Sequence, residues 1–393
     1  MLPLLLSLGL ASAEEPAANP WTLTPVVQVR PRLELDTLRD GTADSGEWFV
    51  SQRARVGVAA EAPHYLARVV VQDVRTWGSE ADTLKDPVAD AMDVHEAWAR
   101  YRSGDGFNVT VGRQELAFDE QRLVGAVDWT QQGRSFDAVR LWGRTGPWNG
   151  EVSAAMLTEG ALAGTGKDKD KLAILLRAGW DPRKEQRPGV VDLVSITESD
   201  AANEQLRETL GLYASGSTGL LSGRVEGYAQ LGSLGDSDYS SWMAGVQGTI
   251  APKVGGKPKF TLWFDNLTGD DDLTDSKLKT FQSPFGTNHK FYGTMDVMCF
   301  TEGCWADGRG LRDAALKIEV MPIPKVKLNV DGHAFMAAAN QTSDQDSMLG
   351  QELDLWASSP IGKNVTLSGG ASALMRPDLD PDMWAFVMFD VAP

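Results

Sequence analysis

Residues 107–144 read FNVTVGRQELAFDEQRLVGAVDWTQQGRSFDAVRLWGR, and this stretch decides the fold. It opens on a run in which apolar Val109 and Val111 alternate with polar Asn108 and Thr110. A second alternating run closes it, with Arg134, Phe136, Ala138 and Arg140 on one parity and Val139 and Leu141 on the other. Alternation with a period of two is typical of a β-strand that has one apolar and one polar face. The segment therefore predicts two strands joined by a polar connection.

The same alternation recurs from residue 21 to the end of the chain. It is clearest in VVQVRPRLELD, residues 26–36, where the apolar parity is formed by Val27, Val29, Pro31, Leu33 and Leu35 and the polar parity by Gln28, Arg30, Arg32, Glu34 and Asp36. Further runs lie at residues 53–61, 316–320 and 325–331. This recurrence predicts an all-β chain.

The two faces of these runs distinguish a membrane barrel from a soluble sandwich. In a sandwich, large apolar side chains form the packed core and the polar face meets solvent. Here the apolar face is rich in Ala, Val and Gly, and the polar face is dense with Arg, Glu and Asp. This composition fits a barrel with lipid outside and a water-filled lumen inside.

The connections between the runs alternate in length. Short ones such as SGDGF (103–107) and TGPWNG (145–150) follow longer acidic ones such as SEADTLKDPVADAMD (79–93) and AANQTSDQDS (338–347). Short periplasmic turns that alternate with long extracellular loops are typical of transmembrane barrels. The pattern predicts a single antiparallel barrel of about 18 strands, with both termini in the periplasm.

The first residues, MLPLLLSLGLASAEE, predict export. An apolar run ends at Ala11-Ser12-Ala13, which fits a signal peptide of residues 1–13 with an A-x-A cleavage site. No other apolar run approaches the roughly 18 residues that a membrane helix needs. We therefore expect residues 14–393 to form one β-barrel in the outer membrane of a Gram-negative bacterium, with outer-membrane lipid as a partner.

The formal net charge of −17 argues against a nucleic-acid partner. Enzymatic signatures also fail. His95-Glu96 begins like a zinc-protease motif, but Ala99 stands where the second histidine is required. Acidic runs such as Asp270 to Asp272 are more typical of solvated loops than of metal sites. We predict no enzyme, no catalytic residue, no metal and no cofactor.

Arginine is distributed unevenly along the chain. Residues 21–145 hold 14 of the 22 arginines but only 1 of the 15 lysines. Guanidinium groups offer carboxylates a rigid, permanently charged fork, whereas lysine is a flexible point charge. The enrichment therefore suggests either a conduit for anions or ion pairs that brace the wall with Glu34, Asp36, Glu61 and Glu96, and the two roles are compatible.

Alternation places most of these arginines on the polar parity. Arg113 shares the parity of Val109 and Val111, so it faces the lumen only if Gly112 forms a bulge. The residues predicted to line the path are Arg30, Arg32, Arg53, Arg55, Arg68, Arg100, Arg113, Arg140, Arg177 and Arg224.

Five sequence words, GRQEL, RLVG, DW, GRSFDAVRL and GTNHKFYGTMD (residues 286–296), resemble the alginate-export family of bacterial outer-membrane β-barrels. The resemblance implies export of an anionic polysaccharide such as alginate, or passage of small anions, in contact with periplasmic export machinery. Two alternatives stay open. One is a general diffusion porin, and the other is a non-conducting scaffold or adhesin that acts through its long loops.

Two further features carry expectations. Cys299 and Cys304, in MCFTEGCW, are spaced to form a disulfide in the oxidising periplasmic pathway. Six tryptophans near strand ends or in loops suit an aromatic girdle at the membrane interface: Trp48, Trp77, Trp129, Trp148, Trp180 and Trp305.

Overall fold

The computed structural model describes residues 20–37, 47–79, 92–160, 163, 169–182, 189–300, 303–304, 308–343 and 345–392. The predicted signal peptide of residues 1–13 lies outside these ranges. No helix within them is long and apolar enough to cross a membrane.

Long antiparallel strands dominate the described chain. The barrel strands are β1 (Thr22–Asp36), β2 (Glu47–Glu61), β3 (Tyr65–Thr76), β4 (Met92–Arg102), β5 (Phe107–Gln114), β6 (Phe136–Thr145), β7 (Trp148–Thr158), β8 (Lys171–Trp180), β9 (Val190–Asp200), β10 (Gln205–Thr218), β11 (Leu221–Leu234), β12 (Ser237–Ile250), β13 (Lys259–Leu267), β17 (Leu311–Ile323), β18 (Val326–Met336), β19 (Met348–Pro360), β20 (Val365–Met375) and β21 (Asp382–Val391). The predicted count of about 18 strands is confirmed.

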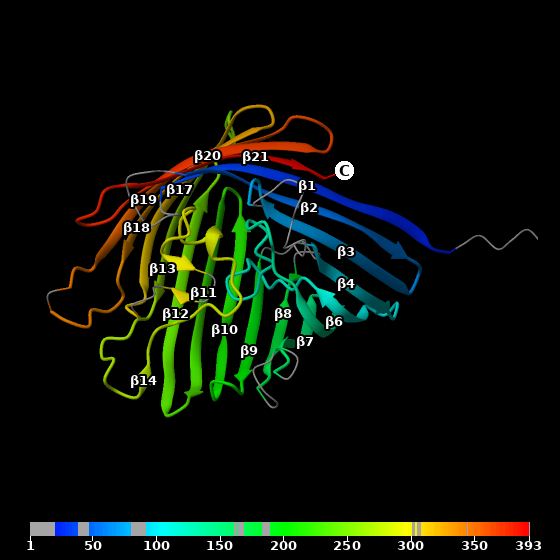
Figure 1. Cartoon of the computed structure of the whole chain (residues 1–393), viewed down its shortest axis with the longest axis horizontal. Helices are drawn as coiled ribbons and strands as arrows, with labels where there is room; N and C mark the ends of the chain where they lie inside the picture. The colour runs from blue at the N-terminus through cyan, green and yellow to red at the C-terminus, as the bar shows by residue number, and fades with distance from the viewer. Residues whose placement is uncertain are drawn as a thin grey trace, which may run out of the picture.

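The strands close into one barrel (Figure 1). Each barrel strand pairs antiparallel with the next, and β1 pairs with β21, with Val29 opposite Val391 and Asp36 opposite Trp384. Closure leaves the sheet without a free edge. Four short elements lie in the connection between β13 and β17: β14 (Lys277–Leu278), the 3₁₀ helix η2 (Asn288–Lys290), β15 (Cys299–Phe300) and β16 (Gly303–Cys304).

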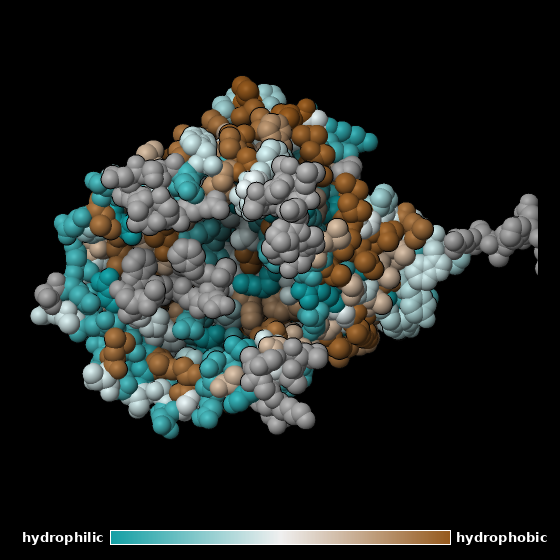
Figure 2. Space-filling model, in the orientation of Figure 1, coloured by the Kyte–Doolittle hydropathy of each residue, from teal (hydrophilic) through white to brown (hydrophobic). Residues whose placement is uncertain are grey.

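Alternation along each strand separates a lipid face from a lumenal face. In β12, exposed Trp242 and Val246 alternate with buried Ser241 and Met243. Apolar side chains on the outer wall are the expected arrangement, because lipid offers polar groups no hydrogen bonds. Figure 2 shows hydrophobic residues mainly along the upper and right margins of the barrel, with hydrophilic residues nearer the middle and along the left margin.

Connections of different length gather at the two ends of the barrel. Residues 62–64, 103–106, 219–220 and 324–325 lie at one end, called here the turn end, together with the longer connections 181–189 and 251–258. The longest connections, such as residues 115–135 and 268–310, lie at the other end, the loop end. Two connections at the loop end are short, residues 201–204 and 235–236. There β9 to β12 stay paired to their tips, and Gly235 adopts a φ of 54°, which suits a tight hairpin. The alternation in length is therefore less strict than the sequence suggests.

Two connections from the loop end fold into the barrel and fill part of the lumen. We call residues 115–135 the first lumenal loop and residues 268–298 the second lumenal loop. They meet at a bridge between Val124 and Phe285. Together with inward side chains of the wall they bury an apolar core that includes Leu116, Phe118, Leu123, Phe281, Phe291, Tyr292 and Met298. The core of this barrel thus lies inside the lumen.

Candidate channel lining and its lumenal loop

Four arginines of β1 and β2 face the lumen, as their parity predicts. Arg30, Arg32, Arg53 and Arg55 are all buried, because the first lumenal loop lies against them. Arg30 donates to the backbone oxygens of Asp128 and Thr130, both at 2.8 Å. Arg32 donates to the backbone oxygen of Trp129 at 3.0 Å. The four guanidinium groups therefore hold a loop, and open water does not cover them.

A single carboxylate, that of Asp128, is shared by three of these arginines. Its oxygens lie 2.8 Å from Arg53, 3.7 Å from Arg30 and 3.9 Å from Arg55. Burial alone would raise the pKa of Asp128, but the neighbouring guanidinium groups outweigh burial and lower it. The carboxylate is therefore ionised at neutral pH.

Arg122 anchors another part of the first lumenal loop on the far wall. Its guanidinium lies 2.7 Å from Asp265 of β13 and 3.0 Å from Glu226 of β11. It also donates to the Tyr292 hydroxyl at 2.6 Å and lies 3.8 Å from the centroid of the Phe291 ring. Burial would lower the pKa of Arg122, yet the two carboxylates raise it well above its ordinary value. This buried cluster joins both lumenal loops to the wall.

Trp129 joins the tips of the two loops. Its ring stacks on His289 at 4.3 Å between centroids, and the Arg32 guanidinium lies 4.5 Å from the centroid of the same ring. Trp384 and Phe386 of β21 contact it edge-on. The expectation that Trp129 belongs to an interfacial girdle is wrong, because its loop folds inward. Trp48, Trp77 and Trp148 are exposed, Trp180 is half-buried and Trp305 lies outside the described residues.

The other predicted arginines on the polar parity lie along the inner wall. Arg68 pairs with Glu96 at 2.6 Å, and Arg140 pairs with Glu151 at 2.7 Å. Arg100 donates to the Thr110 hydroxyl at 2.9 Å and lies over the Trp98 ring. Arg177 and Arg224 reach the first lumenal loop, at Asp119 (3.3 Å) and Glu120 (3.2 Å) respectively. These pairs show that bracing occurs.

Arg113 is the exception, and its placement on the lumen side is wrong. The ladder between β5 and its neighbours continues without a register shift at Gly112, so Arg113 stays on the outward parity. There it lies 3.0 Å from Asp137 and 3.7 Å from Asp93 on the outer wall. Gly112 adopts a φ of 120° without adding a residue to the strand, so no bulge turns Arg113 inward.

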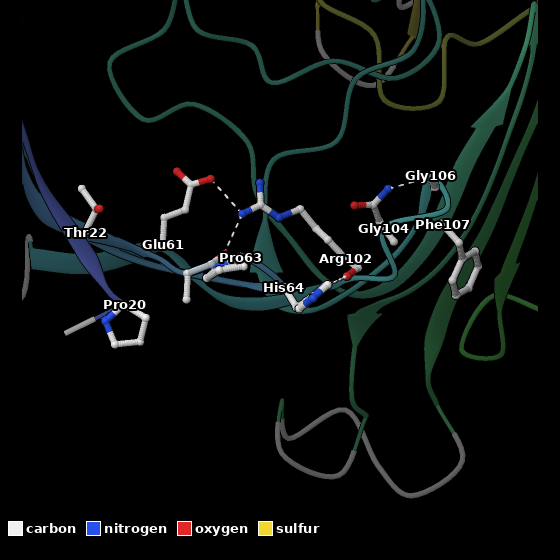
Figure 3. Close-up of a pocket in the computed structure, with 11 residues that line it drawn as sticks. Pro20, Thr22, Glu61, Pro63, His64, Arg102, Gly104, Gly106 and Phe107 are labelled. Atoms are coloured by element: carbon white, nitrogen blue, oxygen red, sulfur yellow. Dashed lines mark hydrogen bonds and ion pairs between the residues drawn. The ribbon is translucent and has the colours of Figure 1, made fainter. Parts of the chain in front are cut away.

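The structure contains two open spaces, one beside the first lumenal loop and one at the turn end. A cavity of about 620 Å³ lies below the first lumenal loop, lined by Asp119, Glu120, Arg140, Trp142, Arg177 and Tyr213 among others. A second space of about 580 Å³ lies at the turn end, where Arg102 bridges Glu61 and the backbone oxygen of Ala62 (Figure 3). Within the part of the chain that the structure describes, no group of three or more His, Cys, Asp or Glu side chains is placed to hold a metal.

The predicted cysteine pair lies at the end of the connection between β13 and β17. Cys299 of β15 is the register partner of Cys304 of β16. Their side chains fall outside what the structure describes, and the disulfide therefore stays a prediction.

The sequence identified the inward arginines and two of their wall partners, Glu34 and Glu96, but not their partners in the first lumenal loop. Asp128 and Glu115 belong to the quoted stretch, but nothing local shows that their segment turns into the lumen. One feature of the sequence did indicate that this segment is buried. The supposedly polar connection contains Leu116, Phe118, Leu123 and Val124, all of which are buried in the structure. Such a cluster is unexpected in a solvated loop and indicates packing against another surface.

Comparison with known proteins adds family and fold. A family model described as alginate export matches residues 28–374. Among solved structures, the outer membrane protein OpdK of Pseudomonas aeruginosa is similar with a TM-score of 0.64 at 10% identity, over 95% of this chain and 98% of that one. OccAB4 of Acinetobacter baumannii is similar with a TM-score of 0.64 at 11% identity, over 94% of this chain and 97% of that one. OccAB1 of the same species is similar with a TM-score of 0.63 at 13% identity, over 94% of this chain and 96% of that one. No curated protein matches the chain.

Proposed function

The chain belongs to the alginate export family of β-barrels in the outer membrane of Gram-negative bacteria, and we propose that it is a channel for anionic solutes. Its cargo in this proposal is an acidic polysaccharide such as alginate, which passes through the lumen beside the two lumenal loops. The lipid face described above is the surface that holds the barrel in the membrane. No enzymatic step is part of the proposal.

One observation carries it: the lumenal face of β1 to β4 gathers arginines on one wall. Arg30, Arg53 and Arg55 share the loop carboxylate of Asp128, and Arg55 also lies 3.8 Å from Glu115 of the same loop. Arg68 and Arg100 continue the series on β3 and β4 and are half-buried. Cations that line a wall of low dielectric constant focus the local field and attract anions. The acidic surface loops contribute little, since the Debye length is about 8 Å at physiological ionic strength.

Arg68 and Arg100 provide the test, because they line the lumen without holding the loop. The purified channel in a planar bilayer under a KCl gradient should favour chloride, and oligouronates should block current more than neutral oligosaccharides of equal length. Replacing both arginines by Gln should move the reversal potential toward that of potassium. Arg113→Gln is the control, because it removes one arginine charge from the outer wall.

A cation-selective wild-type pore would contradict the proposal. So would a double variant that behaves like the control. A second candidate function has its own support: the two lumenal loops bury an apolar core inside the barrel, as a closed scaffold would. The same experiment decides between the two, because a non-conducting scaffold or adhesin passes no current. A general diffusion porin would conduct, but it would show equal block by charged and neutral sugars.

A further inference from the structure

His95 is an extra residue in β4. Val70 of β3 lies opposite Glu96, and Val71 lies opposite Val94, so His95 has no register partner on β3. Such a bulge interrupts the alternation of a strand and re-aims a side chain. His95 and Glu96 are consecutive residues, yet both are buried on the lumenal side of the wall. The bulge therefore turns the His95 ring toward the first lumenal loop.

The His95 ring contacts both ends of that loop. Its Nε2 lies 2.7 Å from Oε1 of Glu115, the first loop residue, and its Nδ1 lies 3.1 Å from Oγ of Ser135, the last. The Ser135 hydroxyl also donates to the backbone oxygen of His95 at 2.6 Å. Because β5 ends at Gln114 and β6 begins at Phe136, these contacts lie just beyond the end of the β5–β6 ladder. We call His95, Glu115 and Ser135 the loop clasp.

The three hydrogen bonds of the loop clasp need three protons. A carboxylate and a backbone oxygen only accept hydrogen bonds, and a hydroxyl has one proton to donate. Since Ser135 donates to the backbone oxygen, its Oγ can only accept a proton from Nδ1. Nε2 must likewise carry a proton for Glu115. All three bonds therefore form together only when His95 is an imidazolium.

We propose that the loop clasp is a pH-sensitive fastener of the first lumenal loop, complete when His95 is an imidazolium and loosened at Ser135 when the ring is neutral. A neutral ring has a single N–H, and the hydrogen bond to the charged Glu115 is the stronger of the two ring contacts. Histidine is the side chain that changes charge between about pH 5 and about pH 8. The Ser135 end of the loop is thus held in mildly acidic medium and released in mildly alkaline medium.

The charged groups around the loop clasp come from three strands and from the loop itself. Arg55 of β2 faces the same carboxylate as the ring, with Nη1 3.8 Å from Oε1 of Glu115. Asp128 of the loop lies 3.9 Å from Arg55. Glu96 of β4 pairs with Arg68 of β3 at 2.6 Å. Among these groups, Glu115 is the carboxylate that contacts the ring directly.

The experiment measures the mobility of a nitroxide spin label at position 132, in the full-length protein in detergent micelles at about pH 5 and about pH 8. Gln132 is exposed and lies close before Ser135 in the chain, so the label reports on this end of the loop. Cys299 and Cys304 are replaced by Ser so that only the introduced cysteine reacts. The ratio of mobile to immobile label should rise about tenfold with pH, the size expected when one hydrogen bond to a charged group is lost.

Three variants test the residues of the loop clasp. His95→Gln should abolish the pH response, and Ser135→Ala should give the mobile spectrum at both pH values. His64→Gln is the matched control, because it removes a histidine at the turn end, where the ring contacts the backbone oxygen of Arg102. It should keep the wild-type response. Heat-modifiable migration on gels reports whether each barrel is folded, and if His95→Gln does not fold, Ser135→Ala decides.

The proton itself is observed by nitrogen NMR of protein that carries isotope-labelled histidine. The His95 signals, assigned by their loss in His95→Gln, should show protons on both ring nitrogens at about pH 5 and on one at about pH 8. A ring with one proton at both pH values would overturn the proposal. So would a wild-type spin label with the same mobility at both, or a folded Ser135→Ala variant that keeps the wild-type pH response.

Discussion

Asp119, in the first lumenal loop, shares the Arg177 guanidinium with Asp192 of β9. Arg177 lies 3.3 Å from Asp119 and 3.8 Å from Asp192. Burial, and then the charge of Asp192, raise the pKa of Asp119 from an ordinary 3.8 to about 7. Two carboxylates with one cation between them do not both ionise readily, so Asp119 carries a proton below neutral pH.

The raised pKa predicts how stability depends on pH. The fold favours protonated Asp119, so its contribution is complete below the unfolded pKa near 4 and is lost as the pH rises through about 7. Between pH 4 and pH 8, wild type should lose on the order of 2 kcal/mol more than Asp119→Asn in urea unfolding from lipid vesicles. Asp272→Asn, in an exposed part of the second lumenal loop, should keep the wild-type profile. Identical profiles for wild type and Asp119→Asn would rule out this titration.

At the scale of residues, the sequence predicted which side chains of a strand face the lumen. Arg30, Arg53 and Arg140 face inward because alternation is a local property of a strand. The loop partner of Arg30 and Arg53 is not local, since Asp128 lies 75 positions from Arg53. The side that Arg113 faces could not be predicted in this way. A glycine with a positive φ does not always form a bulge, and the pairing with the neighbouring strands decides whether Gly112 forms one.

At the scale of elements, the two lumenal loops occupy part of the lumen. The second lumenal loop was expected to be a long acidic loop on the cell exterior, and the first was expected to be a polar connection. Both instead pack inward on an apolar core. The apolar residues of the first lumenal loop indicated that this loop is buried. The partner surface could not be read from the sequence, because the wall residues that complete the core come from β6 to β20. Small inward residues such as Ala155 and Ala173 leave the room that the loops occupy.

The Trp129–His289 stack predicts that the loop tips are coupled. Trp129→Ala removes that stack and the contact with Arg32, at a cost of about 1 kcal/mol or more. We expect the variant channel to fluctuate more often between conductance levels in single-channel records, because the tips then move separately. Trp148→Ala, which removes an exposed tryptophan near the turn end, should leave the records unchanged. If the Trp129→Ala channel changes conductance level no more often than wild type, the loop tips are held by other contacts.

At the scale of the whole molecule, the barrel, its strand number and the grouping of its turns were predictable. Period-two alternation and turn chemistry repeat many times, so an error in one strand does not change the architecture. The filling of the lumen was not predictable, since it depends on which surfaces meet after the sheet has closed.

The two ends of the barrel should be accessible from opposite sides of the membrane. Ser276, in the second lumenal loop, and Gly255, in the turn before β13, are both exposed and lie at opposite ends. A cysteine introduced at 276 should react with a membrane-impermeant maleimide on intact cells, and one at 255 should react only after the outer membrane is permeabilised. The reverse pattern would mean that the barrel is inserted the other way round.

The seam between β1 and β21 has a kinetic consequence. Gln28 donates to Asp390 at 2.9 Å across 362 positions, so β1 and β21 can pair only after all the strands between them have been synthesised. Joining such distant segments is slow, because the entropy of closing so long a loop opposes it. Until then both edge strands are unpaired and prone to pair with other chains. A chaperone that shields β1 until β21 arrives would therefore raise the yield of assembled barrels more than one that accelerates any internal hairpin.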